Sequence, residues 1–202
     1  HDRPNHLCRC RQPRRELKIF MNDITETTND PNNEWLENYP YDDIVVGQAA
    51  RMVRTLTLAD IQAFAAVSGD TNPAHLDPEY ANATLFHGVI GHGMWGGSLI
   101  STVLGTVFPG PGTIYLEQNL HFSRPVHIGD TLNVTVTCTD KHEDKKTIEL
   151  DCLLVNQKGE RVLYGVAKVM APTEKLRMPR IHAPHISLFD PEQRHANLLA
   201  LG

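Results

Sequence analysis

Two side chains that can exchange protons, Asp70 and His75, lie five residues apart in the segment S-G-D-T-N-P-A-H-L-D-P. Between them, Asn72-Pro73 is a turn-forming pair, and a proline disfavours helical backbone at the residue before it. We therefore expect a bend, and not a helix, to hold the pair. A carboxylate and an imidazole that face one cavity can hold a water molecule, one taking its proton while the other orients it or supplies a proton elsewhere. The spacing predicts acid–base chemistry on a small molecule such as water.

The same string also fits a structural role, in which Asp70 caps a turn and His75 is a hydrogen-bonded, partly buried histidine. Metal binding is a further alternative, because His87 and His92 follow soon afterwards in the sequence. These two histidines are five residues apart around two glycines, unlike the i, i+4 spacing of helical zinc sites. We therefore predict neither a metal nor another cofactor, and we expect His92 to pack or to hydrogen-bond locally.

Helical patterns flank the acid–base pair on both sides. Thr57 and Asp60 have the spacing of a capping box before residues 58–67, where apolar residues recur at helical intervals, and Gly69 follows as a stop signal. Downstream, Asp77-Pro78 places a capping carboxylate before a proline, which predicts a short helix through about residue 83. The pair is thus expected in the connection between two helices.

Residues 93–107 contain no charged side chain and have apolar residues on all sides, which predicts a buried helix of about four turns. Such a helix is too short to cross a membrane. Glycines 96, 97 and 105 each cost about 1 kcal/mol relative to alanine in a helix, so we expect other backbone to approach closely there.

Four strand patterns follow this helix. Residues 131–139 alternate strictly between apolar and polar side chains, and residues 112–122, 147–155 and 161–170 are also rich in strand-forming residues and bounded by turns. A long buried helix followed by four consecutive strands predicts an α+β fold, with an antiparallel sheet curled around one helix.

At this point the sequence resembles a known family. The S-G-D-x-N-P-x-H-x-D-P string, the H-G-M before the uncharged helix, the I-Y-L-x-Q-x-L-x-F strand and the R-P-V-x-I-G-D turn resemble the MaoC-type (R)-specific enoyl-CoA hydratases of the hot-dog fold. The resemblance covers about residues 41–172. Within the family it looks closest to the hydratase-like domain that precedes a phosphate acetyltransferase domain in bifunctional proteins.

The resemblance implies a role for five residues. Asp70 would be the base that activates water, His75 would help to hold that water and handle the α-carbon proton, and Asn72 would steady the pair. Gly93 would offer its backbone N–H to the thioester oxygen, which also agrees with the unpaired N–H groups and positive potential of a helix start. Ser98 matches a serine that would line the acyl pocket, although a serine in a buried helix commonly bonds to its own preceding carbonyl.

The expected reaction is addition of water to a trans-2-enoyl thioester, or its reversal, with coenzyme A or acyl carrier protein as the carrier. One alternative is a hot-dog thioesterase, but these usually act through a carboxylate on or beside the central helix, and residues 93–107 have none. Another is a non-catalytic acyl-CoA-binding module attached to a transferase, although the presence of both Asp70 and His75 speaks against it. The family also implies a homodimer.

Composition agrees with one globular domain plus tails, since the 202 residues are 41% hydrophobic and 21% charged. The net charge of −5 argues against nucleic acid or an anionic membrane as a partner. Cys138 and Cys152 fall on apolar strand faces, while Cys8 and Cys10 lack a second ligand pair. Because nothing resembles a disulfide framework, we expect a cytoplasmic protein.

The two ends differ in character from the middle. Residues 1–40 form a polar leader that we expect to be partly disordered. Its first 20 residues carry six basic and two acidic side chains, and we expect Met21 to be the native start. Residues 41–172 would be the hydratase domain. Residues 173–202 contain several prolines and read as a linker toward a further domain, with a helix beginning near residue 193.

Overall fold

A computed structural model describes residues 24–25, 34–184 and 186–187 of the chain. The predictions about Met21, Cys8, Cys10 and the helix near residue 193 lie outside these residues.

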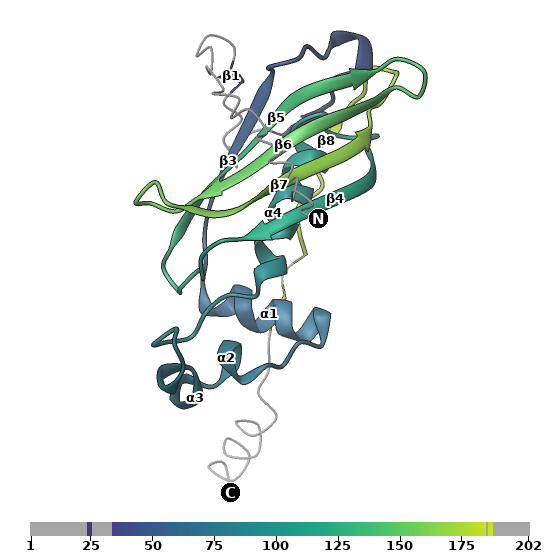
Figure 1. Cartoon of the computed structure of the whole chain (residues 1–202). Coiled ribbons are helices and arrows are strands. Elements are labelled where there is room, and N and C mark those ends of the chain that lie inside the picture. The colour runs from purple at the N-terminus through teal and green to yellow at the C-terminus, as the bar shows by residue number, and fades with distance from the viewer. Residues whose placement is uncertain (1–23, 26–33, 185, 188–202) are drawn as a thin grey trace, which may run out of the picture.

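The main sheet has the strand order β1-β3-β5-β6-β7-β4. All neighbouring strands pair antiparallel except β1 and β3, which are parallel. Its strands are β1 (Ile24–Thr25), β3 (Ala49–Thr55), β4 (Ile114–Phe122), β5 (Thr131–His142), β6 (Thr147–Val155) and β7 (Arg161–Met170). The sheet curves around helix α4 (Gly93–Thr106), as Figure 1 shows. This arrangement confirms the expected α+β class and the hot-dog architecture.

The core lies between the sheet and one face of α4. Alternate residues of β5, Leu132, Val134 and Val136, are fully buried, and they belong to the same hydrophobic cluster as Ile100 and Val103 of α4. The buried face of the strand and the buried face of the helix therefore form one apolar layer.

Two expectations about α4 were wrong. The helix is buried along one face only, since Met94, Ser101 and Thr102 on the other face are exposed in the single chain. The backbone of other elements also does not approach closely at its glycines. An added Cβ at Gly96 would lie 3.4 Å from Leu154 Cδ2, which is a side-chain contact, and one at Gly105 would meet nothing within 4 Å.

Helices α1 (Leu58–Ser68), α2 (Pro73–Leu76) and α3 (Pro78–Ala83) lie together beyond one end of the sheet (Figure 1). The predicted capping box of α1 is present, with Thr57 accepting from the Asp60 N–H and the Asp60 carboxylate accepting from the Thr57 N–H. Gly69 ends α1 with a left-handed φ of 76°. Asp77 caps α3 as predicted.

The packed region reaches beyond both limits predicted for the domain. Strand β2 (Trp35–Glu37) pairs antiparallel with β8 (Arg177–Pro179), and the short 3-10 helix η1 (Tyr41–Asp43) follows β2. Between β2 and η1, the fully buried Asn38 side chain donates to the Pro111 and Glu174 carbonyls. These hydrogen bonds tie residues 173–176 to the segment around Asn38, although the side chains of residues 173–179 are exposed.

Candidate active site

The acid–base pair sits where three short elements meet. Asp70 follows the Gly69 cap of α1, and Asn72 then caps α2 by accepting a hydrogen bond from the Ala74 N–H at 3.1 Å. Pro73 is the first residue of α2, so His75 lies on a one-turn helix. The expectation of a bend was therefore wrong for His75. A proline disfavours helical backbone at the residue before it, but it is favoured at the first position of a helix.

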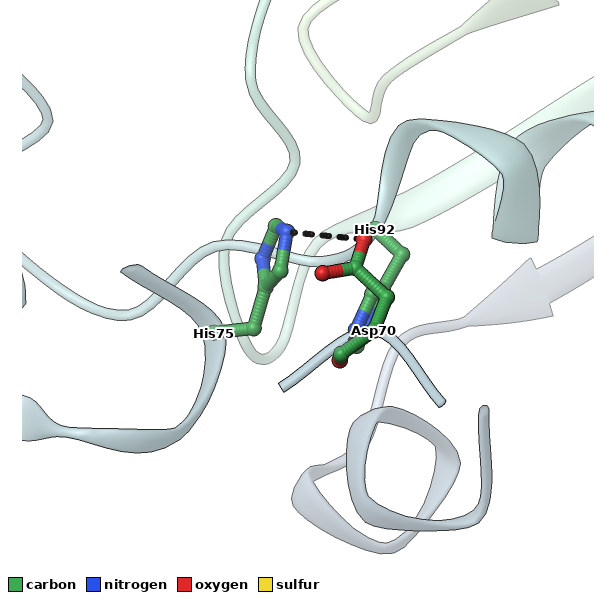
Figure 2. Close-up of side chains that lie close together, drawn as sticks. All are labelled: Asp70, His75 and His92. Carbon is green, nitrogen blue, oxygen red and sulfur yellow. Dashed lines mark hydrogen bonds and ion pairs between the residues drawn. The ribbon is translucent and has the colours of Figure 1, made fainter. Parts of the chain in front are cut away.

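Asp70 and His75 face each other, with 4.0 Å between Asp70 Oδ2 and His75 Nε2 (Figure 2). His75 is buried, and its Nδ1 lies 2.9 Å from the Ile90 carbonyl oxygen. A carbonyl only accepts, so Nδ1 carries a proton and Nε2 is the ring nitrogen left to exchange one. The Asp70 side chain is 52% exposed. The gap between the two groups is too long for a direct hydrogen bond, and a water molecule can bridge it.

Asn72 connects to Asp70 through its backbone. The Asn72 N–H donates to Asp70 Oδ1 at 3.2 Å, while the Asn72 side chain is occupied as the cap of α2. Asn72 therefore orients the carboxylate that faces His75.

A cavity of about 340 Å³ lies on the His75 side of this pair, and Asp70 is not among its lining residues. Its lining is mainly apolar and includes His75, Ile90, Gly93, Phe122, Val162 and Leu163. Gly93 is the first residue of α4, so its N–H has no intrahelical carbonyl to bond. A Cβ at this position would lie 3.0 Å from Phe122 Cε1, which explains why glycine stands between helix start and cavity. The site thus combines an acid–base pair, an apolar cavity and the positive end of a helix.

Ser98 lies elsewhere in the single chain. Its hydroxyl donates to the Trp95 carbonyl at 2.6 Å, and the residue is on the exposed face of α4. Ser98 is not among the cavity-lining residues. Its role in the acyl pocket stays a prediction.

His92 belongs to the site, although we expected it only to pack or to hydrogen-bond locally. Its Nε2 lies 3.0 Å from the Asp70 carbonyl oxygen, across 22 residues of sequence. Its ring centroid is 3.9 Å from that of His75. Within the described parts of the chain, Asp70, His75 and His92 form the one group whose ligand atoms are close enough for a metal, all lying within 4.8 Å of one another. His87, which the sequence had suggested, is not in this group, and the absence of a metal stays a prediction.

Comparison with known proteins identifies the family. A model of the MaoC like domain matches residues 45–156. The chain belongs to the MaoC-like domain family. Among curated MaoC-like relatives, the (R)-specific enoyl-CoA hydratase of Rhodospirillum rubrum is 46% identical over 134 residues, which are 65% of this chain and 91% of that protein. The 3-hydroxybutyryl-CoA dehydratase of Methylorubrum extorquens is 36% identical over 67% of this chain and 85% of that protein.

Solved structures agree with this MaoC-like assignment. The unliganded R-hydratase PhaJ1 of Pseudomonas aeruginosa superposes with a TM-score of 0.74, at 45% identity, over 77% of this chain and 99% of that chain. The (R)-hydratase of A. caviae gives a TM-score of 0.62 at 43% identity, over 64% of this chain and 98% of that chain. These named relatives are hydratases and dehydratases, enzymes that add or remove water.

Proposed function

We propose that this chain catalyses the reversible addition of water to a trans-2-enoyl thioester, giving the (R)-3-hydroxyacyl thioester. One observation carries the proposal: the Asp70 carboxylate and His75 Nε2 face each other across 4.0 Å beside an apolar cavity at the start of α4. The names of the relatives in the family support the same reaction.

Two proton transfers complete the reaction. The Asp70 carboxylate takes a proton from water as its oxygen forms a bond to the β-carbon of the enoyl group. The electron pair of the double bond moves toward the thioester oxygen, and the α-carbon then accepts a proton from Nε2 of His75 in its imidazolium form, in which both ring nitrogens carry a proton. Nδ1 cannot serve, because it donates to the Ile90 carbonyl. A water molecule that bridges the 4.0 Å gap then carries the proton from Asp70 to Nε2 of the neutral His75 ring, which restores the carboxylate and the imidazolium.

The start of α4 stabilises the charge that develops on the thioester. The Gly93 N–H would donate to that oxygen as it becomes an enolate. Asn72 holds the carboxylate in place through its N–H. Ser98 would contribute to the acyl pocket only where a second chain covers the exposed face of α4.

The decisive assay follows loss of the enoyl absorbance of crotonyl-CoA, beside release of free thiol. Hydration removes the absorbance and releases no thiol, whereas a thioesterase releases thiol. A module that only binds acyl-CoA does neither. An enoyl absorbance that stays constant at high enzyme concentration would refute the proposal. The same assay with crotonyl-acyl carrier protein distinguishes the two carriers.

The stereochemistry has its own test. Asp70 and His75 come from one short segment, so water and proton reach the same side of the enoyl plane, which gives syn addition. The (R) configuration is proposed from the relatives. Coupling to an (S)-specific 3-hydroxyacyl-CoA dehydrogenase should yield little NADH, and chiral chromatography of the hydrolysed product should give the (R) acid. Strong NADH formation without an epimerase would contradict this assignment.

We also propose a homodimer in the cytoplasm that belongs with a phosphate acetyltransferase domain. The free, buried Cys138 and Cys152 thiols are compatible with a reducing compartment. No helix in the described residues has the length and hydropathy needed to span a membrane. The link to an acetyltransferase rests on the motif resemblance, and phosphate-dependent release of coenzyme A from acetyl-CoA by the protein as encoded in its gene would test it.

A further inference from the structure

His92 precedes α4 but does not cap it. It occupies the N-cap position, and its side chain makes no hydrogen bond to the helix. The ring instead turns toward the segment that carries the acid–base pair and is 3% exposed. A buried imidazole at a helix start, where serine or aspartate would cap, is not explained by helix stability.

The hydrogen bond of His92 fixes its tautomer. Its Nε2 lies 3.0 Å from the Asp70 carbonyl oxygen, which only accepts, so Nε2 carries the proton. Its Nδ1 is buried and has no hydrogen-bond partner among the described residues. The neutral ring therefore has one polar function, which is to hold the backbone of Asp70.

The same ring packs near two other rings. One side faces His75 at a centroid distance of 3.9 Å and a tilt of 32°, and Phe64 of α1 lies at 5.0 Å. His92 is thus connected to α1, to the Asp70 segment and to α2 at once (Figure 2 shows its place beside Asp70 and His75). Because the Asp70 side chain is half exposed, burial does not fix the carboxylate, and its position depends on such tethers.

We propose that His92 is a positioning residue that sets the distance between the Asp70 carboxylate and His75 Nε2, acting through the Asp70 carbonyl and the His75 ring. The inference rests on the proposed hydratase function. It follows that His92 acts on proton transfer and not on substrate binding.

Two variants separate its two contacts. His92→Phe keeps an aromatic ring beside His75 and removes the donor, whereas His92→Gln places an amide N–H near the position of Nε2–H. With crotonyl-CoA we expect kcat of His92→Phe to fall by about 10- to 100-fold with KM little changed, since misplacement by about 1 Å costs on that order. His92→Gln should recover part of this loss. His142→Phe, at the far end of β5, is the control for loss of a histidine away from the site and should keep the wild-type kcat.

A double-mutant cycle tests whether the effect passes through Asp70. In an Asp70→Asn background, His92→Phe should add little further loss, because groups that act as a unit are not additive. Full additivity would overturn the proposal, as would a His92→Phe variant with wild-type kcat, a change confined to KM, or equal losses in the Phe and Gln variants.

An experiment without substrate tests the role of His92 independently of the proposed hydratase activity. ¹⁵N NMR of the histidine rings should show His92 protonated at Nε2 and His75 at Nδ1. A His92 proton on Nδ1 would overturn the proposal even if the variants do not fold. If wild type hydrates no enoyl thioester, the proposed function fails, and the NMR result still decides whether His92 holds Asp70.

Discussion

Asp70 combines an exposed side chain with a fixed position. Its carboxylate is half exposed, yet Asn72 orients the side chain and His92 holds the backbone. Fixed geometry on an exposed acid is costly in conformational entropy, which argues for a role beyond capping a turn. The structural alternative predicts that only stability depends on this side chain.

Asp70→Asn distinguishes these two roles. An asparagine oxygen can still accept the Asn72 N–H, but it cannot take a proton from water, so we expect kcat to fall by roughly 10²–10⁴. The melting temperature should change little. Asp140→Asn on β5 is a control for loss of one exposed carboxylate. Wild-type turnover in Asp70→Asn would remove Asp70 from the mechanism.

The two core thiols predict a pH effect on stability. Burial raises the pKa of Cys138 to about 11 and that of Cys152 to about 12, from 9.0. Above about pH 9 the folded state therefore holds protons that the unfolded state has lost, so the free energy of unfolding decreases as pH rises. We expect about 1 kcal/mol per thiol between pH 8 and pH 10.

Urea unfolding at both pH values measures this loss. A Cys138→Ala, Cys152→Ala variant should be less stable at pH 8 because of the smaller side chains, but it should lose less stability on going to pH 10. Equal losses in the two proteins would contradict the prediction.

At the scale of elements, the sequence predicted the helices and strands whose own residues show a clear periodic pattern. Strands β6 and β7 have the predicted bounds, and α1 and α4 differ from theirs by one residue. Strand β3 was missed because Arg51 and Arg54 interrupt its apolar alternation. Helix α2 was missed because one turn is too short to show a helical period. The place of His92 could not be predicted, since it depends on a contact 22 residues away.

Gly165 reveals how closely β7 and β4 approach. An added Cβ there would lie 1.8 Å from the Asn119 carbonyl oxygen, which is backbone and cannot move without opening the pair. We expect Gly165→Ala to destabilise the protein by about 1–3 kcal/mol, as overpacking usually does. Gly105→Ala meets open space and is the matched control, with little or no destabilisation in urea unfolding. Equal effects of the two changes would refute this account.

At the scale of the whole molecule, β4 is an edge strand that nothing in the described chain covers. Strand β4 pairs with β7 on one side and with no described strand on the other. Ile114, Leu116 and Phe122 are exposed along it. The uncovered face of α4 also carries exposed residues, among them Met94 and Ser98. An apolar edge beside an open helix face is a surface that soluble proteins normally cover.

A second copy is the occupant that we expect, because an edge strand can pair with itself across a two-fold axis and extend the sheet. Such a dimer would also bring a partner surface over Ser98, the residue whose predicted role the single chain leaves open. Light scattering at micromolar concentration should therefore give twice the mass of the chain.

Leu116→Glu would place a charge at the β-bulge near the start of β4 and should shift the mass toward monomer, with loss of activity if the partner completes the pocket. Val67→Glu on α1 changes an apolar residue that is more exposed than Leu116, at 84% against 45%, and lies away from this edge, so it should leave the dimer intact. A monomeric wild type would contradict the assembly, and a dimeric Leu116→Glu would move the interface away from β4. Activity that falls in proportion to the monomer fraction would mean that one chain alone does not form a working site.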